Sequence, residues 1–282
     1  MKKIEGFCID RRKHNETHYG TLYYRYIKIP FANKKYQTRV MRLWVPPHFD
    51  INKEYGVIYM TDGQNAVDEN LTAYGEWNME DHLHDLVEEG YPEFIIVGID
   101  CPHNGDERTL EYLVGPQTSF KPKKLQNYYG DKMAAYFTDK VVPYINSKFN
   151  INQDLVTFCG SSMGGLFSFY ICSKYPKIFK NCISFSPAFF FFSREQILNE
   201  INKLNPTVDL MPKYVYFMGG GDRLEKRLAP YCDYLVNEFR KRGFNEDRLL
   251  YMKDESRIHH ESTWSDFVKP AIRFLLGEHS NR

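Results

Sequence analysis

The segment Gly160–Gly165 has the residue types of a serine nucleophile held in a tight turn. Its sequence, Gly-Ser-Ser-Met-Gly-Gly, fits the pattern G-x-S-x-G with Ser162 at the centre. In that pattern a sharp strand-to-helix turn exposes the serine, and small residues two positions before and after it relieve crowding. An apolar run before the segment and a helix-compatible run, 163–174, after it supply that context. We therefore predict that Ser162 is a catalytic nucleophile.

A serine hydroxyl is a weak nucleophile and needs a neighbouring base. Among the nine histidines, His259 and His260 follow the last candidate strand of the chain. In hydrolases with this serine pattern, the histidine comes last in chain order, in a loop near the carboxyl ends of the strands. We expect the base to be one of this pair.

The base in turn needs a carboxylate to orient it, placed between the serine and the histidine in the chain. Asp222 directly follows three glycines, Gly219 to Gly221, which come after an apolar run. Flexible glycines would let the backbone turn there and carry Asp222 over the end of the sheet. Glu225, three residues later, is the competing candidate. Asp222 could also cap the helix that we predict after it.

Acyl transfer further needs two backbone N–H donors for the oxyanion of the tetrahedral intermediate. One donor should be Met163, directly after the nucleophile, and the other should come from a loop after an earlier strand. The run 57–60 is such a strand, and Thr61-Asp62-Gly63-Gln64-Asn65 follows it. Because glycine permits close backbone approach, we expect the N–H of Gln64 to be the second donor.

The elements that must position these residues alternate along the chain. Near-continuous apolar runs are typical of parallel strands that are buried on both faces. The predicted buried strands are 57–60, 94–99, 155–159, 182–185 and 214–218, with 249–252 as one more candidate. Two further strands, 21–29 and 38–45, precede these buried strands; they are rich in Tyr, Ile and Val and end at prolines.

Helical spacing of apolar residues predicts helices over 131–149, 226–242 and 264–276, and Pro143 should kink or end the first of these. The alternation predicts an α/β fold, a three-layer sandwich with a mostly parallel central sheet and antiparallel N-terminal edge strands, about 1–50. No repeat or linker interrupts it, so we expect residues 1–282 to form a single domain. The stretch 101–127 is predicted to be a long irregular connection.

Composition sets wider limits. The 282 residues carry 37 Lys+Arg and 36 Asp+Glu, a formal charge of +1, so no overall field favours nucleic acid or an acidic membrane. None of the six cysteines forms a CxxC pair, and no apolar segment follows the N-terminus as in a signal peptide. We therefore expect a cytoplasmic protein with reduced thiols. His82 and His84 have no third ligand nearby, so no metal site is predicted.

At this point the chain resembles the putative esterase family of α/β hydrolases, which includes feruloyl and acetylxylan esterases, siderophore esterases, S-formylglutathione hydrolases and mycolyltransferases. The resemblance runs from about residue 43 to 276. The elbow Gly-Ser-Ser-Met-Gly-Gly is much more specific than the bare pattern. The other segments that carry the resemblance are 59–65, 95–100, Glu107-Arg108 with Glu111-Tyr112, and His259-His260-Glu261-Ser262-Thr263-Trp264.

The resemblance implies an α/β-hydrolase fold and a Ser-His-Asp triad. The closing motif of the family places the catalytic histidine on His259, with His260 in place of an asparagine and still open as an alternative. The family's acid matches Asp222, although related members often have glutamate, which keeps Glu225 open. The donor after Asp-Gly in the mycolyltransferases corresponds to Gln64. No metal or organic cofactor is implied.

These residues predict hydrolysis of a small-molecule carboxylic ester, carbohydrate-linked feruloyl or acetyl esters above all. Hydrolysis of enterobactin-like siderophores and acyl transfer by the same triad are the alternatives. The candidate pocket residues are Trp77, Arg108, Phe189 and Phe190. Phe189 and Phe190 belong to an aromatic run after a strand, and such a run could hold an aromatic acid. The same run could equally be core. The sequence indicates no oligomeric state.

Overall fold

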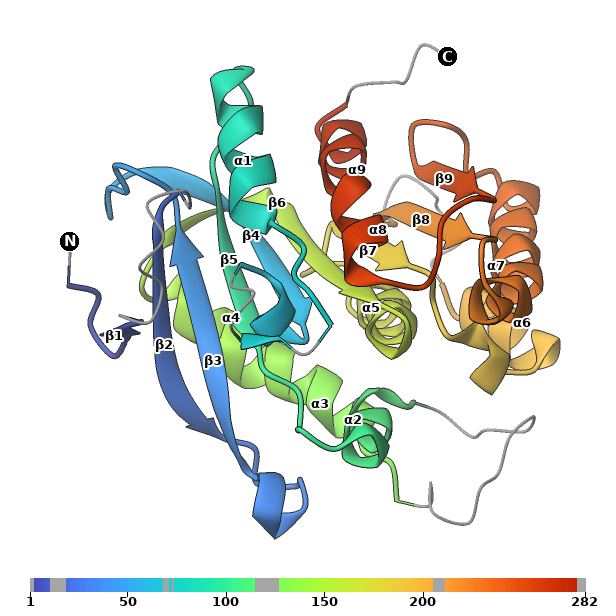
Figure 1. The fold of residues 1–282 in the computed structure, drawn as a ribbon, viewed down its shortest axis with the longest axis horizontal. Helices are drawn as coiled ribbons and strands as arrows, with labels where there is room; N and C mark the ends of the chain where they lie inside the picture. The colour runs from blue at the N-terminus through green and yellow to red at the C-terminus, as the bar shows by residue number, and fades with distance from the viewer. Residues whose placement is uncertain are drawn as a thin grey trace.

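The computed structural model describes residues 3–10, 19–67, 71–72, 74–114, 127–204 and 211–277. In these ranges nine strands form one twisted sheet in the order β1-β2-β3-β5-β4-β6-β7-β8-β9 (Figure 1). The strands are β1 Cys8–Ile9, β2 Thr21–Lys28, β3 Thr38–Val45, β4 Glu54–Thr61, β5 Phe94–Ile99, β6 Asn150–Ser161, β7 Asn181–Phe185, β8 Lys213–Gly219 and β9 Leu249–Asp254.

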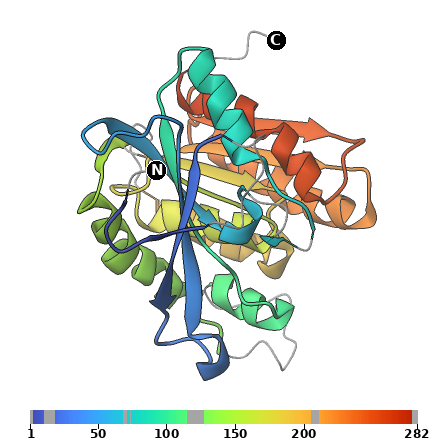
Figure 2. The same ribbon diagram turned by 60° about the vertical axis from the view of Figure 1, so that its left-hand side comes forward.

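Strand direction divides the sheet into two parts. The pairs β1/β2, β2/β3 and β3/β5 are antiparallel, whereas β5, β4, β6, β7, β8 and β9 run parallel to one another. The predicted α/β class with antiparallel N-terminal edge strands is therefore confirmed. The strands β1, β2 and β3 form the antiparallel edge of the sheet, and α3 (Gly130–Tyr136) and α4 (Val142–Asn146) pack against one of its faces (Figure 2).

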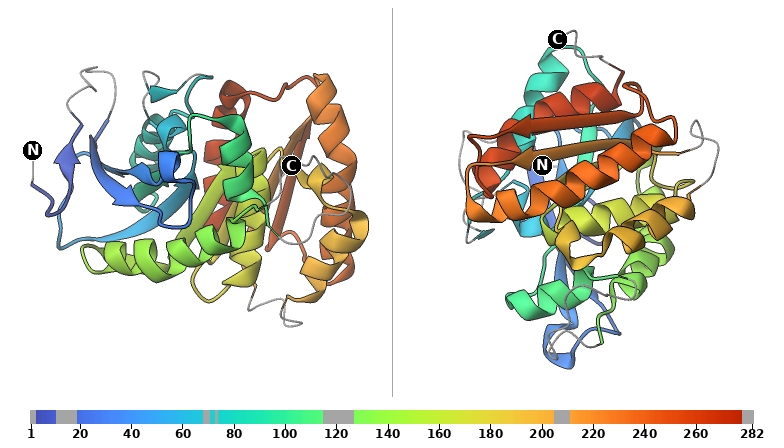
Figure 3. Two further views of the ribbon diagram at one scale, coloured as in Figure 1. Left: turned by 90° about the horizontal axis from the view of Figure 1, so that it is seen from below. Right: turned by 90° about the vertical axis from the view of Figure 1, so that its right-hand side faces the viewer.

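Helices cover both faces of the parallel part (Figure 3). Side chains of α1, α8 and α9 pack with one face, and those of α3 to α7 pack with the other. The helices are α1 Met79–Glu88, α2 Gly105–Tyr112, α3 Gly130–Tyr136, α4 Val142–Asn146, α5 Met163–Lys174, α6 Arg194–Asn202, α7 Arg223–Lys241, α8 Glu261–Asp266 and α9 Val268–Leu275.

Burial on both faces explains the apolar runs from which the strands were predicted. Along β4, Val57 and Tyr59 belong to one core, and Ile58 and Met60 belong to the other. Since successive side chains of a strand point to opposite faces, a strand between two helical layers needs apolar residues at every position.

Two helix predictions need correction. The predicted helix 131–149 consists of α3, a π-helical turn at Phe137–Val141 and α4. Pro143 lies in the first turn of α4, where its missing N–H costs little, so the chain continues helically past it. The predicted helix 264–276 breaks at Phe267, whose ring stacks on Phe217 of the sheet at 4.0 Å, and its first part begins at Glu261.

The stretch 101–127 is not irregular throughout. It contains α2, which begins after Asn104, and the Asn104 side chain accepts hydrogen bonds from the N–H groups of Asp106 and Glu107. Residues 115–126 of the stretch lie outside the described residues. Within the described ranges, no helix combines the length and the apolar character that crossing a membrane requires.

The packing of the core predicts how one substitution changes the free energy of unfolding. Phe158 of β6 is fully buried among the rings of Phe137, Phe167 and Phe179, with centroids 5.0, 5.7 and 5.2 Å away. Phe158→Ala should lower the free energy of unfolding by about 3–5 kcal/mol in a urea titration, because it removes a buried ring and leaves a cavity.

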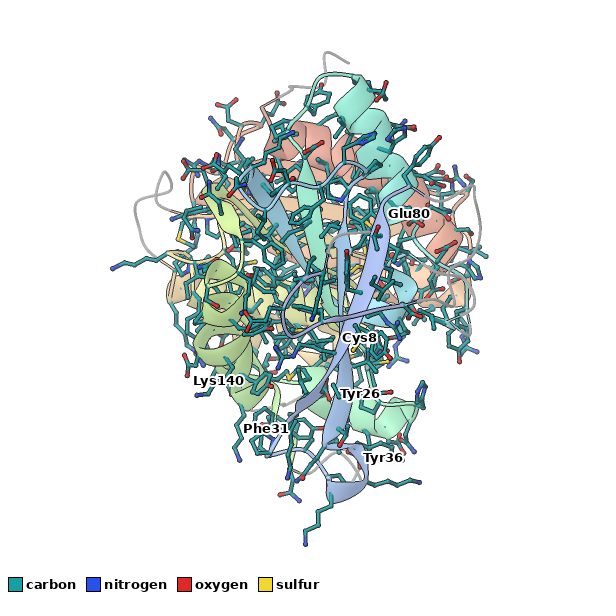
Figure 4. The ribbon with its side chains drawn as sticks, turned by 90° about the vertical axis from the view of Figure 1, so that its left-hand side faces the viewer. Cys8, Tyr26, Phe31, Tyr36, Glu80 and Lys140 are labelled. Carbon is teal, nitrogen blue, oxygen red and sulfur yellow. The ribbon has the colours of Figure 1, made fainter. Side chains whose placement is uncertain are left out.

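Tyr26 is the matched control for this measurement. It is an aromatic residue of β2 that is 67% exposed on the outer face of the edge strands (Figure 4). Tyr26→Ala should change the free energy of unfolding by less than about 0.5 kcal/mol. Equal losses in the two variants would contradict the proposed position of the core.

Candidate active site

Ser162 lies at the turn between β6 and α5 with a backbone conformation that side chains rarely adopt. Its φ is 55° and its ψ is −119°. Its N–H donates to the carbonyl of Phe185 at 2.9 Å, and its carbonyl accepts from the N–H of Ala188 at 2.9 Å. Such a conformation persists only where surrounding structure holds it, and it is typical of a serine nucleophile elbow.

The glycines on either side of Ser162 allow the turn to approach the end of β4. A Cβ atom on Gly160 or on Gly164 would lie 2.3 or 2.2 Å from Oγ1 of Thr61. A real Cβ atom does not come so close to another heavy atom. The pattern G-x-S-x-G is therefore a packing requirement in this chain, because the glycines let the end of β4 lie against the turn that carries the nucleophile.

His259 and Glu225 form a buried contact. Nδ1 of His259 lies 2.8 Å from Oε1 of Glu225, and the Glu225 side chain is fully buried. The other carboxylate oxygen, Oε2, accepts the N–H of Gly219 at 2.8 Å. Glu225 is thus fixed by a backbone donor at one oxygen and presents the other to the imidazole.

Asp222, the other candidate acid, makes different contacts. Its Oδ2 accepts the backbone N–H of His259 at 2.7 Å, and its Oδ1 accepts the N–H of Glu225 at 2.8 Å, so it caps α7 and holds the histidine loop. Partial burial opposes ionisation of Asp222, but these N–H donors more than compensate and lower its pKa. Both carboxylate oxygens of Asp222 are thus bonded to backbone N–H groups, and the carboxylate that contacts the imidazole is that of Glu225, one helical turn later.

The second histidine has a different environment. Nδ1 of His260 lies 3.0 Å from Oγ of Ser262 and accepts the Ser262 N–H at 3.2 Å, which makes His260 the N-cap of α8. The His259 ring lies edge-on to Trp264 at 5.0 Å, and Trp264 donates to Oγ of Ser186 at 3.0 Å. Of the two candidates, His259 is the one whose imidazole contacts a buried carboxylate.

The two predicted N–H donors lie on adjoining turns. Met163 is the first residue of α5, where helix geometry offers its N–H no carbonyl within the helix. Gln64 is the middle residue of a 3-10 turn, Gly63–Asn65, that directly follows β4. A Cβ atom on Gly63 would lie 2.6 Å from the backbone of Gly98 in β5, so the backbone of this turn packs directly against β5.

Side chains from the segment after β5 hold the same turn. Oε1 of Gln64 accepts the Cys101 N–H at 3.1 Å, and its Nε2 donates to the Cys101 sulfur at 3.1 Å. Arg108 binds both carboxylate oxygens of Asp62, at 2.6 and 2.8 Å. Sequence reasoning missed Asp62 and Cys101. The signal that could have found them is the parallel pairing of β4 with β5. Neighbouring parallel strands bring the loops that follow them to the same end of the sheet.

Two of the four predicted pocket residues belong to the core. Trp77 is 1% exposed and stacks on Phe185 at 5.4 Å, and Phe189 is fully buried against Phe169 at 5.4 Å. These large rings lie close to the sheet and fill the space between the strands and the covering segments. Phe190 is half-buried, with the Arg227 guanidinium 4.3 Å from its ring centroid.

A cavity of about 310 Å³ lies elsewhere in the molecule. Its lining comes from the end of β3, the start of β5 and the second half of α1, and includes Trp44, Phe94 and the stacked rings of Tyr19 and His84. That is the amino end of the parallel strands, whereas Ser162, Asp62 and His259 lie at the carboxyl end. The cavity is therefore not part of the candidate site.

With parallel strands, a strained serine elbow and a histidine–carboxylate contact at the carboxyl ends of those strands, the molecule has the α/β-hydrolase architecture. The sequence matches the Esterase family, described as "Putative esterase", over residues 33–199. The chain belongs to this family, and this makes it a carboxylic ester hydrolase.

Solved structures share the fold. The chain superposes on the BES protein of Bacillus cereus with a TM-score of 0.71 at 17% identity, covering 95% of this chain and 98% of that one. The siderophore hydrolase EstA of Aspergillus nidulans gives 0.68 at 16% identity, with 91% and 95% covered. The ferulic acid esterase AmCE1/Fae1A of Anaeromyces mucronatus, in complex with ferulic acid, gives 0.64 at 18% identity, with 98% and 100% covered.

A curated relative has a similar length. The chain is 20% identical over 258 residues to the uncharacterized protein YbbA of Bacillus subtilis (strain 168), which covers 89% of this chain and 98% of the relative.

Glu261 is a further buried acid at this end of the sheet. It is 8% exposed, and its Oε1 accepts from Nδ2 of Asn65 at 3.3 Å. Burial, together with a smaller contribution from the nearby Asp62 carboxylate, raises the pKa of Glu261 to about 7, although a backbone hydrogen bond to its own carboxylate and the charge of Arg108 act in the opposite direction. The folded protein therefore binds this proton more tightly than the unfolded chain does.

The raised pKa predicts a pH-dependent effect of Glu261→Gln. As the pH rises from 4.5 to about 7, Glu261 loses its proton more readily in the unfolded chain than in the folded protein. The free energy of unfolding of the wild type therefore falls over this pH range. The variant cannot ionise there. The free energy of unfolding of the variant relative to wild type should therefore rise by on the order of 1–2 kcal/mol from pH 4.5 to pH 8.

Urea titrations at both pH values measure this difference. Glu255→Gln, which removes an exposed carboxylate from the preceding loop, is the control. A relative stability of Glu261→Gln that is the same at pH 4.5 and pH 8 would show that the environment of Glu261 is not as described.

Proposed function

We propose that this protein is a serine ester hydrolase with Ser162 as nucleophile, His259 as general base and Glu225 as the acid that orients the base. The observation that carries the proposal is the 2.8 Å contact between Nδ1 of His259 and the fully buried Glu225 carboxylate. A carboxylate at Nδ1 leaves Nε2 as the basic nitrogen and stabilises the imidazolium that forms when it takes a proton.

The first half of the reaction acylates the serine. Nε2 of His259 takes the Ser162 hydroxyl proton as Oγ attacks the ester carbonyl. The N–H groups of Met163 and Gln64 donate to the oxyanion of the tetrahedral intermediate. When the intermediate collapses, the imidazolium returns the proton to the leaving alcohol, and the acyl group remains on Oγ.

The second half releases the acid. Water gives a proton to Nε2 of His259 and attacks the acyl carbonyl, and the same two N–H groups stabilise the second tetrahedral intermediate. Collapse frees the carboxylic acid and returns the proton to Ser162. Every proton that moves is carried by His259, and Glu225 orients the imidazole without taking part in the proton transfer.

For the substrate, we propose a small ester, with a feruloyl or an acetyl group on a carbohydrate as the leading candidates. The likeness to a ferulic acid esterase in complex with ferulic acid supports the aromatic acid. Of the aromatic residues named for the pocket, Phe190 is the one with exposed ring surface, so it is the residue from which we expect contact with an aromatic acyl group.

Siderophore ester hydrolysis is the second candidate. It is supported by the likeness to siderophore hydrolase EstA, whose TM-score of 0.68 exceeds the 0.64 of the ferulic acid esterase. Acyl transfer to an alcohol would use the same residues, and analysis of the products with an added alcohol distinguishes it from hydrolysis.

The role of Ser162 predicts loss of turnover without loss of fold. Ser162→Ala should lower kcat/KM for p-nitrophenyl acetate by a factor of 10³ or more, because the nucleophile is absent, while the melting temperature stays close to that of wild type. Methyl ferulate and a catecholate triester, assayed beside it, rank the candidate substrates.

Ser161→Ala is the control, because it removes the neighbouring serine of the same turn. We expect it to keep activity within a few-fold of wild type. Hydrolysis by Ser162→Ala at the wild-type rate would end the proposal, and equal kcat/KM for acetyl and feruloyl esters would remove the aromatic preference.

The two acids make opposite predictions. Glu225→Gln should lower kcat about 10²- to 10⁴-fold, because the neutral amide no longer stabilises the imidazolium. Asp222→Asn should lower kcat only a few-fold and should mainly cost stability, on the order of 1 kcal/mol, because it weakens the cap of α7 and the bond to the His259 N–H.

Kinetics with p-nitrophenyl butyrate and thermal unfolding of both variants measure these effects. The reverse order, with Asp222→Asn as the variant with the larger loss of kcat, would return the role of the acid to Asp222.

A further inference from the structure

The turn that carries the Gln64 N–H depends on an unfavourable backbone conformation. Asp62, which begins the turn, has φ 53° and ψ 49°, in the left-handed region. For a residue other than glycine this conformation costs free energy, and it needs support from its surroundings. The direction in which the Gln64 N–H points follows from the dihedral angles of Asp62, two residues earlier in the same tight turn.

Helix α2 provides this support through two side chains. Nε and Nη2 of Arg108 bind the two oxygens of Asp62 at 2.6 and 2.8 Å, in the bidentate geometry that fixes orientation as well as charge. Oη of Tyr112, one turn later on α2, accepts the N–H of Asp62 at 3.1 Å. The Arg108 guanidinium also lies 5.3 Å from the centroid of the Tyr112 ring.

The Asp62 carboxylate is directed between α2 and the nucleophile elbow. Its side chain is 6% exposed, and a Cβ atom on Gly164 would lie 3.1 Å from its Oδ2. A shift of this carboxylate would therefore move the turn relative to Ser162. The fixed position of Asp62 links α2 to both candidate oxyanion donors.

We propose that Arg108 is a positioning residue of the acyl-transfer reaction, which holds Asp62 so that the Gln64 N–H is aimed at the oxyanion. This inference rests on the proposed function. It replaces the expectation that Arg108 binds the substrate. Two of the three guanidinium nitrogens are bonded to Asp62, whose carboxylate balances the charge, and the Arg108 side chain is 25% exposed.

The two roles have different kinetic consequences. A positioning residue acts on the transition state, so its loss lowers kcat and leaves KM nearly unchanged. Loss of a residue that binds an anionic part of the substrate instead raises KM, and it does so only for substrates that carry the anion. Arg108→Met keeps the length of the side chain and removes the charge and the hydrogen bonds.

The experiment compares wild type, Arg108→Met and Asp62→Asn on p-nitrophenyl acetate and on p-nitrophenyl hemisuccinate, which carries a carboxylate. Both variants break the same pair from opposite sides, and asparagine tolerates the left-handed conformation. We expect kcat to fall about 10- to 100-fold for both esters, with KM within about three-fold of wild type.

A second readout tests the oxyanion site directly. Phenylboronic acid adds to a serine nucleophile and forms a tetrahedral anion, so its affinity depends on the donors that bind an oxyanion. Its Kd should rise in both variants by about the factor by which kcat/KM falls. In the double variant Arg108→Met with Asp62→Asn, the fall in log(kcat/KM) should be smaller than the sum of the falls in the two single variants. The reason is that the double variant leaves no buried charge unpaired.

Arg39→Met is the matched control. Arg39 also binds α2 through a buried ion pair, with Glu111 at 2.8 Å, but this pair holds the helix and not Asp62. The control should lower the melting temperature and leave kcat and the boronate Kd within about three-fold of wild type. An equal kinetic loss in Arg39→Met would mean that α2 acts only as a scaffold and would overturn the inference.

The inference and the proposed function fail in different ways. Loss of wild-type ester hydrolysis in Ser162→Ala establishes the proposed function first. With that result in place, an unchanged kcat in both Arg108→Met and Asp62→Asn, or a rise in KM confined to the hemisuccinate ester, overturns the positioning role of Arg108 alone.

Discussion

The backbone conformation of Ser162 is the constraint on which the rest of the site depends. A φ of 55° at a residue other than glycine costs on the order of 1–3 kcal/mol, so the surrounding structure has to impose it. Phe185 of β7 and the segment after it hold the backbone of Ser162, and Gly160 and Gly164 leave room for Thr61 of β4. Three neighbouring parallel strands thus meet at one residue.

This meeting explains why the other parts of the site come from loops that are distant in sequence. In a parallel sheet, the carboxyl ends of all strands lie at one edge, so the loops after β4, β6, β8 and β9 converge there. Glu225 follows β8 and His259 follows β9, and their contact joins the last two strands of the sheet. The turn after β4 reaches the elbow from the other side.

Most of the fold and part of the site could be predicted from the sequence. Continuous apolar runs identified the buried strands because both faces of the sheet are covered by helices. The G-x-S-x-G pattern identified the turn of Ser162 because only glycine fits beside Thr61. Both signals are local, since each depends on residue types within a few positions.

Local sequence patterns do not specify which side chains become partners in the folded protein. Asp222 and Glu225 lie on the same turn after β8, and which of them faces His259 depends on how α7 begins. Asp222 caps that helix, and this brings Glu225 under the imidazole. Trp77 and Phe189 are as aromatic as a pocket residue would be, but only the packing shows that they are fully enclosed.

The central claim is that Ser162 is an activated nucleophile, and covalent labelling tests it most directly. A fluorophosphonate reacts with such a serine by forming a bond between phosphorus and Oγ with loss of fluoride. Intact-mass measurement and peptide mapping should show one adduct per chain, located on Ser162. An adduct on Ser161 or another residue, or ester hydrolysis that continues in protein that takes up no label, would contradict the account.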